Sequence, residues 1–167
     1  MRADGRRGST VVEAALFTPL LVLLLMGLVE LGRVAYTYVA VQKILYNLGR
    51  YLGTQQGVNF CDESDATVTA AKNFALTGNT EATTDAYLPN LTAEQIQVRI
   101  ERRNPETGEL EACDCSSTGC DANAGGLAPY AIVVSIPEGY PIQLRIPRLL
   151  LEPIPLRPQV RLPYGGT

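Results

Sequence analysis

Histidine is absent from all 167 residues of this chain. Its absence excludes Ser-His-Asp and Cys-His nucleophile arrangements, and it removes histidine-ligated metal sites as well. The sequence also lacks a phosphate-cradling glycine loop. Paired carboxylates occur, such as Glu109 with Glu111, but the charged surroundings of this pair are typical of a solvated hairpin rather than an acid-base pair. We therefore expect no catalytic residue and no enzyme activity.

Metal and cofactor signals are equally weak. The residues Asp121, Asn123 and Gly125 faintly resemble a calcium loop, yet the later bidentate acid of such loops is missing. The four cysteines contain no C-x-x-C pair, although a four-thiolate zinc site remains an alternative to disulfides. We expect no cofactor and no bound metal.

Charge is distributed unevenly along the chain. The leader carries Arg2, Arg6 and Arg7 with a single acid, Asp4, whereas the part beyond Gly53 has 14 acidic residues against 8 basic ones. A basic end stays in the cytoplasm when a membrane helix inserts, so the acidic body is expected to cross the membrane. An acidic body is also a poor surface for phosphates, which excludes nucleic acid as a partner.

One long apolar stretch dominates the N-terminal third. Residues 14–29 contain no charge and are mostly Leu, Val and Ala. As a helix they extend roughly 24 Å, which is short of the ~30 Å hydrocarbon core, so apolar neighbours at both ends complete the span. We predict a transmembrane segment at about 11–34.

A carboxylate, Glu13, stands at the start of this stretch. In lipid it costs about 2.5 to 3.5 kcal/mol at a helix centre and less near the interface, so it needs water or a positive partner. It follows a basic leader and Gly8 in the run RRGSTVVEAALFTPLLVLLLMGLVELGR. This arrangement resembles a class III (type IV pilin-like) prepilin, and specifically the TadE-like family of Tad/Flp pilus minor pilins.

The resemblance implies a processing event and an assembly residue. In that family a membrane aspartyl peptidase cuts after the glycine, here between Gly8 and Ser9, and Glu13 then becomes the fifth residue and faces a new N-terminal amine. Ala14 would be the sixth residue after cleavage, a position at which major Flp pilins usually have an aromatic residue. The chain is also far longer than a major pilin. Both differences favour a minor pilin.

Partners and location follow from the same resemblance. We expect a single-pass protein of the bacterial inner membrane with a cytoplasmic N-terminus and a periplasmic C-terminal domain, which becomes extracellular after assembly into a pilus. The implied partners are the membrane, other pilin subunits through the N-terminal helix, the prepilin peptidase and the Tad secretion and assembly machinery. An uncleaved single-pass anchor carrying a periplasmic binding or adaptor module remains the alternative. A cleaved secretory signal is less favoured, because no small-x-small site ends the apolar run.

The helical pattern continues beyond the membrane. Large or aliphatic residues recur every three or four positions, at Leu31, Val34, Tyr38, Val41, Leu45, Leu48 and Leu52. This spacing predicts one long helix over 9–53, about 65 Å in length. Pro19 predicts a kink or a short melted turn, with Thr18 bonding to a freed carbonyl, and Glu30 is placed to pair with Arg33.

The remainder, 54–167, is expected to form one extracytoplasmic domain. Asp62, Ser64 or Asp65 can cap a second helix through Leu76 that ends at Gly78-Asn79. Its apolar face contains Val68, Ala71, Phe74 and Ala75.

Strands are expected to follow this helix. Alternation predicts a half-buried strand at 95–102, a hairpin partner at 110–112 and a more continuously apolar, central strand at 130–136. Seven of the eleven prolines fall after 136 and favour an edge segment at Ile142, Leu144 and Ile146, an apolar turn at 149–151 and a last strand at 156–162. The fold class is therefore α+β, with a pilin-like order of long helix, short helix and small antiparallel sheet.

All four cysteines, Cys61, Cys113, Cys115 and Cys120, lie on the side expected to be oxidising. A bond between Cys113 and Cys115 is the least favoured pairing, because two residues of separation strain the required geometry. We expect Cys61 to reach the cysteine loop at 113–126, with a second bridge inside that loop.

Overall fold

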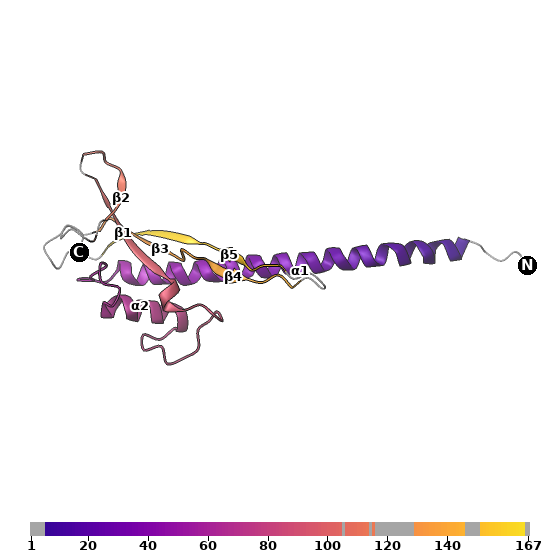
Figure 1. Ribbon diagram of the computed structural model, residues 1–167, viewed down its shortest axis with the longest axis horizontal. Helices are drawn as coiled ribbons and strands as arrows, with labels where there is room; N and C mark the ends of the chain where they lie inside the picture. The colour runs from indigo at the N-terminus through magenta and orange to yellow at the C-terminus, as the bar shows by residue number, and fades with distance from the viewer. Residues whose placement is uncertain (1–5, 105, 114, 116–128, 146–150, 166–167) are drawn as a thin grey trace, which may run out of the picture.

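The computed structural model describes residues 6–104, 106–113, 115, 129–145 and 151–165. A long helix, α1, a short helix, α2, and small antiparallel sheets make up these residues, which confirms the α+β class (Figure 1). The elements in chain order are α1 (Arg6–Gly53), α2 (Ala66–Thr77), the 3-10 helix η1 (Ala93–Gln95), β1 (Gln97–Arg103), β2 (Leu110–Ala112), β3 (Ala131–Ser135), β4 (Tyr140–Ile142), β5 (Ile154–Leu156) and β6 (Gln159–Pro163).

Four strands form the main sheet, in the order β2-β1-β3-β6, and every pairing is antiparallel. Strand β3 lies in the interior of this order, and all five of its residues are buried. The continuously apolar strand was thus correctly predicted to be central. Pro163 belongs to the edge strand β6, which pairs with β3 on one side only. A proline, which has no backbone N–H, is tolerated in such a strand.

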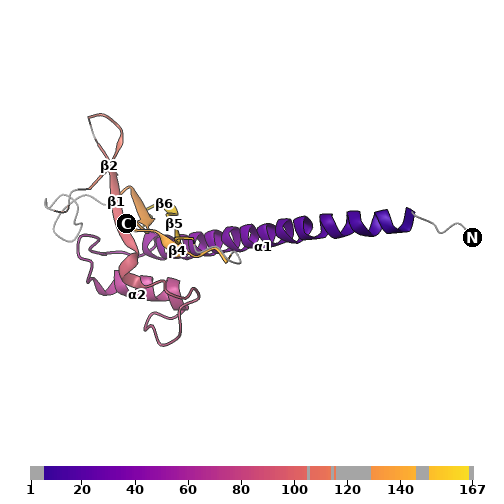
Figure 2. The same cartoon turned by 45° about the vertical axis from the view of Figure 1, so that its right-hand side comes forward.

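The second half of α1 packs against this sheet and supplies much of the core. Val41, Leu45, Leu48 and Leu52 are fully buried, as the predicted stripe requires from Val41 onward. Leu31 and Tyr38, which belong to the same predicted stripe, have 66 % and 41 % of their surface exposed. Figure 2 shows the domain gathered at the C-terminal end of α1.

A glycine permits the close contact between α1 and the sheet. A Cβ on Gly49 would lie 2.6 Å from Cδ1 of Leu162 and 3.4 Å from Cγ2 of Val134. A side chain at position 49 would require Leu162 to shift, so glycine eases the close approach of α1 to β3 and β6.

Helix α2 begins and ends at the expected signals. A side-chain oxygen of Asp65 accepts hydrogen bonds from the backbone N–H groups of Thr67 (2.8 Å) and Val68 (3.1 Å). Gly78 ends the helix in the left-handed region, at φ +79°, where glycine is favoured. The predicted apolar face was wrong at Phe74, which is 39 % exposed and packs its ring on Tyr51 at the margin of the core.

Several predicted boundaries also differ. Helix α1 begins at Arg6 rather than at residue 9 and continues without interruption through Pro19. Strand β1 begins two residues late because residues 93–95 form η1, where the Gln95 side chain accepts a bond from the Thr92 N–H (3.1 Å). The predicted strand 156–162 is two strands, since Pro158 and its neighbour separate β5 from β6. Ile146 and most of the predicted turn at 149–151 lie outside the described residues.

Strands β4 and β5 pair with each other and form a separate two-stranded sheet. We call the described part of 140–156 the arm. It lies beside α1 and extends from the domain toward the N-terminal half of that helix (Figures 1 and 2). The arm therefore brings C-terminal residues close to the part of α1 that was expected to span a membrane.

Candidate functional site

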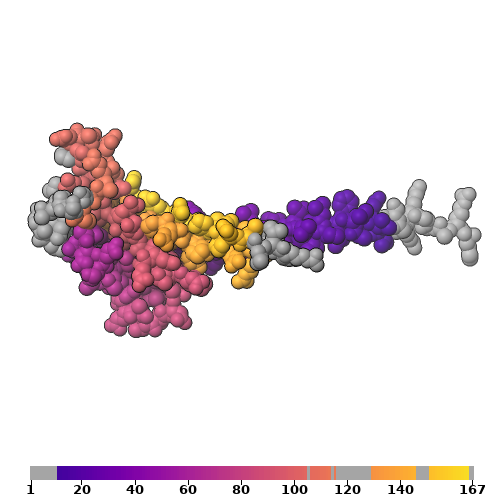
Figure 3. Space-filling model, in the orientation of Figure 1, coloured from indigo at the N-terminus to yellow at the C-terminus, as the bar shows by residue number. Residues whose placement is uncertain are grey.

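The N-terminal half of α1 is an apolar surface that the domain leaves uncovered. Residues 11–29 are all exposed, and the most apolar window of 18 residues has a mean hydropathy of 2.3 with none of it buried. Among the described residues, α1 is the one helix long and apolar enough to cross a membrane. Figure 3 shows it leaving the body as a single rod. This is the form of a single-pass membrane protein.

The predicted processing and assembly residues lie on the first turns of this rod. The backbone of Gly8 and Ser9 is already helical, since α1 begins at Arg6. Glu13 is exposed, and neither of the ion pairs among the described residues includes it. The structure brings no other described element to these positions, so their roles remain predictions.

Pro19 is accommodated inside a continuous helix. The Thr18 hydroxyl donates a hydrogen bond to the Ala14 carbonyl oxygen at 2.6 Å. The carbonyl that Pro19 leaves without its helical donor is that of Ala15, four residues before the proline. The bond from Thr18 therefore differs from the predicted bond to a freed carbonyl. The predicted kink remains a prediction.

A group of polar contacts joins α1 to the arm. The Arg33 guanidinium donates to the Glu30 carboxylate at 2.8 Å and also to the backbone carbonyl of Gln143. The backbone N–H of Arg145 donates to the same Glu30 oxygen at 3.3 Å. We call Glu30, Arg33, Gln143 and Arg145 the clasp. The sequence predicted the pair within the helix, but it gave no signal for the arm.

Two tyrosines tie the C-terminal segments to distant parts of the domain. The Tyr140 hydroxyl donates to the Pro89 carbonyl and the Tyr164 hydroxyl to the Gln55 carbonyl, each at 2.8 Å. Burial removes both phenols from water and raises the pKa of each above its usual value of 10.0. Both hydroxyls therefore remain protonated donors at neutral pH.

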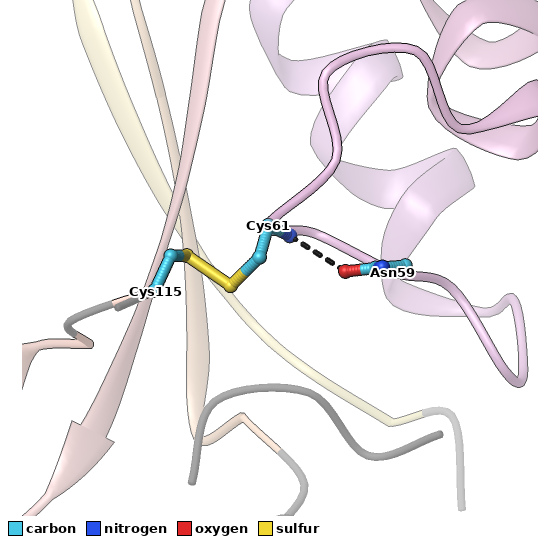
Figure 4. The surroundings of a disulfide bond; sticks show 3 residues. All are labelled: Asn59, Cys61 and Cys115. Carbon is cyan, nitrogen blue, oxygen red and sulfur yellow. Dashed lines mark hydrogen bonds between the residues drawn. A yellow bond between two sulfur atoms is a disulfide. The ribbon is translucent and has the colours of Figure 1, made fainter. Parts of the chain in front are cut away.

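A disulfide fixes the loop before α2 to the end of the β1–β2 hairpin. Cys61 bonds to Cys115 with 5.4 Å between their Cα atoms, and the Cys61 N–H donates to Oδ1 of Asn59 at 3.0 Å (Figure 4). These two sulfurs are joined, so they cannot act as zinc thiolates. Cys113 is also disulfide-bonded, and Cys120 lies outside the described residues.

The other charged groups considered in the sequence do not converge on a site. Glu109 and Glu111 are exposed, and Glu111 accepts a bond from the Asn104 amide at 2.8 Å. The residues Asp121, Asn123 and Gly125 lie outside the described residues. No group of three metal-ligating side chains occurs in the described part of the chain.

One buried cation was not predicted. Lys72 is only 9 % exposed although it belongs to α2, and it lines a hollow of about 620 Å³ together with Glu63, Glu94 and Glu138. The sequence around Lys72, including the adjacent Ala71, does not indicate that this side chain would be buried. The hollow is lined by acids on separate elements that do not pair with Lys72, so it has no evident chemistry.

Comparison with known proteins adds one match. The sequence profile of the TadE-like protein family matches residues 8–50. That range includes Gly8, Glu13 and nearly all of α1, but it is less than half of the chain. The match confirms the resemblance to TadE-like proteins and indicates an association with a Tad pilus. No curated protein and no solved structure matches the chain.

Proposed function

We propose that this chain is a TadE-like minor pilin of a Tad/Flp pilus, a structural protein that joins other pilin subunits through its N-terminal helix. The observation that carries the proposal is that the family match and the expected functional features fall in the same part of the chain. The family match covers the residues in which Gly8, Glu13 and the uncovered apolar surface of α1 occur together. A buried helix of a soluble protein would have neither that exposure nor that motif.

The proposed membrane arrangement places the basic leader in the cytoplasm and the acidic, disulfide-bonded domain in the periplasm. Arg2, Arg6 and Arg7 favour retention of the leader. The bond between Cys61 and Cys115 is typical of an oxidising compartment. The charge asymmetry and the disulfide therefore support the same orientation independently.

Processing would occur between Gly8 and Ser9 by a prepilin peptidase. In the uncleaved chain this bond lies in the first turn of α1, where the backbone N–H groups lack partners and the helix is easily unwound. Glycine lowers helix stability by about 1 kcal/mol relative to alanine, which eases local opening. Gly8 thus suits a bond that a peptidase must reach at the membrane face.

Glu13 would then act during assembly. Cleavage creates an α-amine on Ser9 with a pKa of about 8, and this amine must leave water when helices pack together. The Glu13 carboxylate of a neighbouring subunit can neutralise it, so the desolvation of both charges is offset only when the helices are in register. Glu13 is free to do so, because it lies exposed on α1.

The alternative is an uncleaved single-pass anchor that carries a periplasmic binding or adaptor module. Gly8→Ala and deletion of the peptidase separate the two functions by gel mobility of the chain. A minor pilin migrates as the longer, uncleaved form in both cases, compared with wild type. An anchor migrates identically in all three strains, and that result would refute the proposal.

A further inference from the structure

Two open apolar grooves lie beside the clasp, one between α1 and the arm and one on α1 itself with Arg145 at its end. One measures about 380 Å³ and is lined by Leu23, Met26, Gly27 and Leu31 of α1 and by Leu144 and Ile154 of the arm. The other measures about 340 Å³ and is lined by Val22, Leu25, Met26 and Val29. Met26, Glu30 and Arg145 line both grooves. The two hollows therefore share one polar end.

That shared end carries an excess of positive charge. The Glu30 carboxylate already accepts bonds from Arg33 and from the Arg145 backbone. The Arg145 side chain is exposed, and no hydrogen bond or ion pair with another described residue engages its guanidinium. Two arginines thus face one carboxylate, and one cation is available for an anion.

The grooves lie on opposite sides of a ridge. Successive residues turn by about 100° around a helix, so the row of Val22, Leu25 and Val29 lies nearly half a turn from the row of Leu23, Gly27 and Leu31. Met26 and Glu30, four residues apart, lie between these two rows. A single straight helix from a neighbouring subunit cannot enter both grooves at once.

We propose that the two grooves hold the two acyl chains of one membrane phospholipid, whose phosphate binds Arg145. The inference rests on the membrane insertion proposed above. Two apolar grooves that meet at one cation match a ligand with two apolar chains and one anionic head. Empty grooves of this size would lose dispersion contacts along their lining, and water would find few polar partners there.

A pair of glycines provides a matched test of the grooves. A Cβ on Gly27 or on Gly32 meets no atom within 4 Å, so a side chain can begin at either position without a clash. Leucine at 27 fills a groove, whereas Gly32 lines neither. The full chain is incorporated into nanodiscs of dioleoyl phosphatidylglycerol, released and analysed by native mass spectrometry. Wild type and Gly32→Leu should retain one lipid, and Gly27→Leu should retain it with about tenfold lower affinity.

Arg145→Gln tests the cationic end and keeps the backbone N–H that bonds Glu30. It should bind phosphatidylglycerol no better than dioleoylglycerol, which has the same chains but no phosphate. Arg99→Gln is the control, since Arg99 is exposed on β1, outside both grooves. Equal retention in every variant would mean non-specific lipid only and would overturn the inference.

A different occupant would give a different pattern. If Gly27→Leu abolishes cross-links between neighbouring chains while no variant binds lipid, the groove takes a helix and the lipid inference is wrong. Failure of the proposed membrane insertion would give a different result. The proposed function predicts that the inserted chain resists alkaline washing of membranes. A chain that remains in washed membranes without bound lipid contradicts this inference alone.

Discussion

The backbone N–H of Arg145 donates a hydrogen bond to the Glu30 carboxylate, although the two residues are 115 positions apart in the chain. Glu30 belongs to the helix that carries the membrane-type surface, and Arg145 belongs to the arm. The contact places a C-terminal segment at the outer end of the predicted transmembrane span. It gives Glu30 a structural role that a helical pair with Arg33 would not require.

Glu30→Gln should loosen the arm from α1. The amide keeps an acceptor oxygen but loses the charge that strengthens its bonds to Arg33 and Arg145. Amides of 140–145 and 151–156 should exchange with deuterium several-fold faster than in wild type, while those of β3 do not change. Glu152→Gln, an exposed substitution on the same arm, serves as the control. Unchanged exchange in Glu30→Gln would show that the clasp contributes nothing to holding the arm.

Loss of the disulfide should destabilise the domain. Cys61 and Cys115 close a loop with a sequence separation of 54, and removing such a bond typically costs about 2 to 4 kcal/mol of the free energy of unfolding. The double variant Cys61→Ser with Cys115→Ser, unfolded in denaturant in detergent, should show that loss. We also predict that the chain has two disulfides in total. Four titratable thiols in unreduced, unfolded protein would contradict both statements.

Gly49→Ala should weaken the packing of α1 on the sheet. The new Cβ would lie 2.6 Å from Cδ1 of Leu162, so this half-buried side chain on the edge strand β6 must move. Overpacking of this kind typically costs about 1 to 3 kcal/mol, which exceeds the helix propensity that alanine gains, about 1 kcal/mol. Gly32→Ala meets no neighbour and should be neutral or slightly stabilising. Thermal unfolding of both variants in detergent measures the difference, and equal midpoints would contradict the close contact.

Much of the domain could be predicted from local patterns. Asp65 and Gly78 gave the ends of α2, the stripe from Val41 gave the buried face of α1, and the apolar run of β3 gave its central place. Each of these depends on neighbours within one or two turns or on the period of a single element. Such signals survive in one sequence without knowledge of the tertiary structure.

The clasp and the grooves could not be predicted in this way. Arg33 donates to the backbone carbonyl of Gln143, and Glu30 accepts from the backbone N–H of Arg145. Because both contacts use backbone groups of the arm, the residue types at 143 and 145 do not indicate them. The pairing of β4 with β5 was also missed, because prolines in both strands indicated only edges. The course of the arm along α1 depends on that pairing, and the grooves depend on the arm.

Glu13→Gln should separate membrane insertion from assembly. The neutral side chain costs less in lipid, so insertion should be unchanged or improved. Without its charge, residue 13 cannot neutralise the amine on Ser9 of a neighbour, and incorporation with partner pilins should fall. Piliation and co-purification of partner pilins measure the effect, and Glu81→Gln, exposed on the domain, is the control. Normal piliation in the Glu13→Gln strain would leave Glu13 as an interfacial residue at the start of an anchor.

The most direct test of the account is the N-terminal mass of the chain recovered from its native host. A minor pilin processed by a prepilin peptidase begins at Ser9, so the N-terminal peptide should lack the first eight residues and carry a new amine. In cells without the peptidase the same peptide should begin with the leader. Recovery of intact Met1 to Gly8 from cells with an active prepilin peptidase would contradict the proposed function.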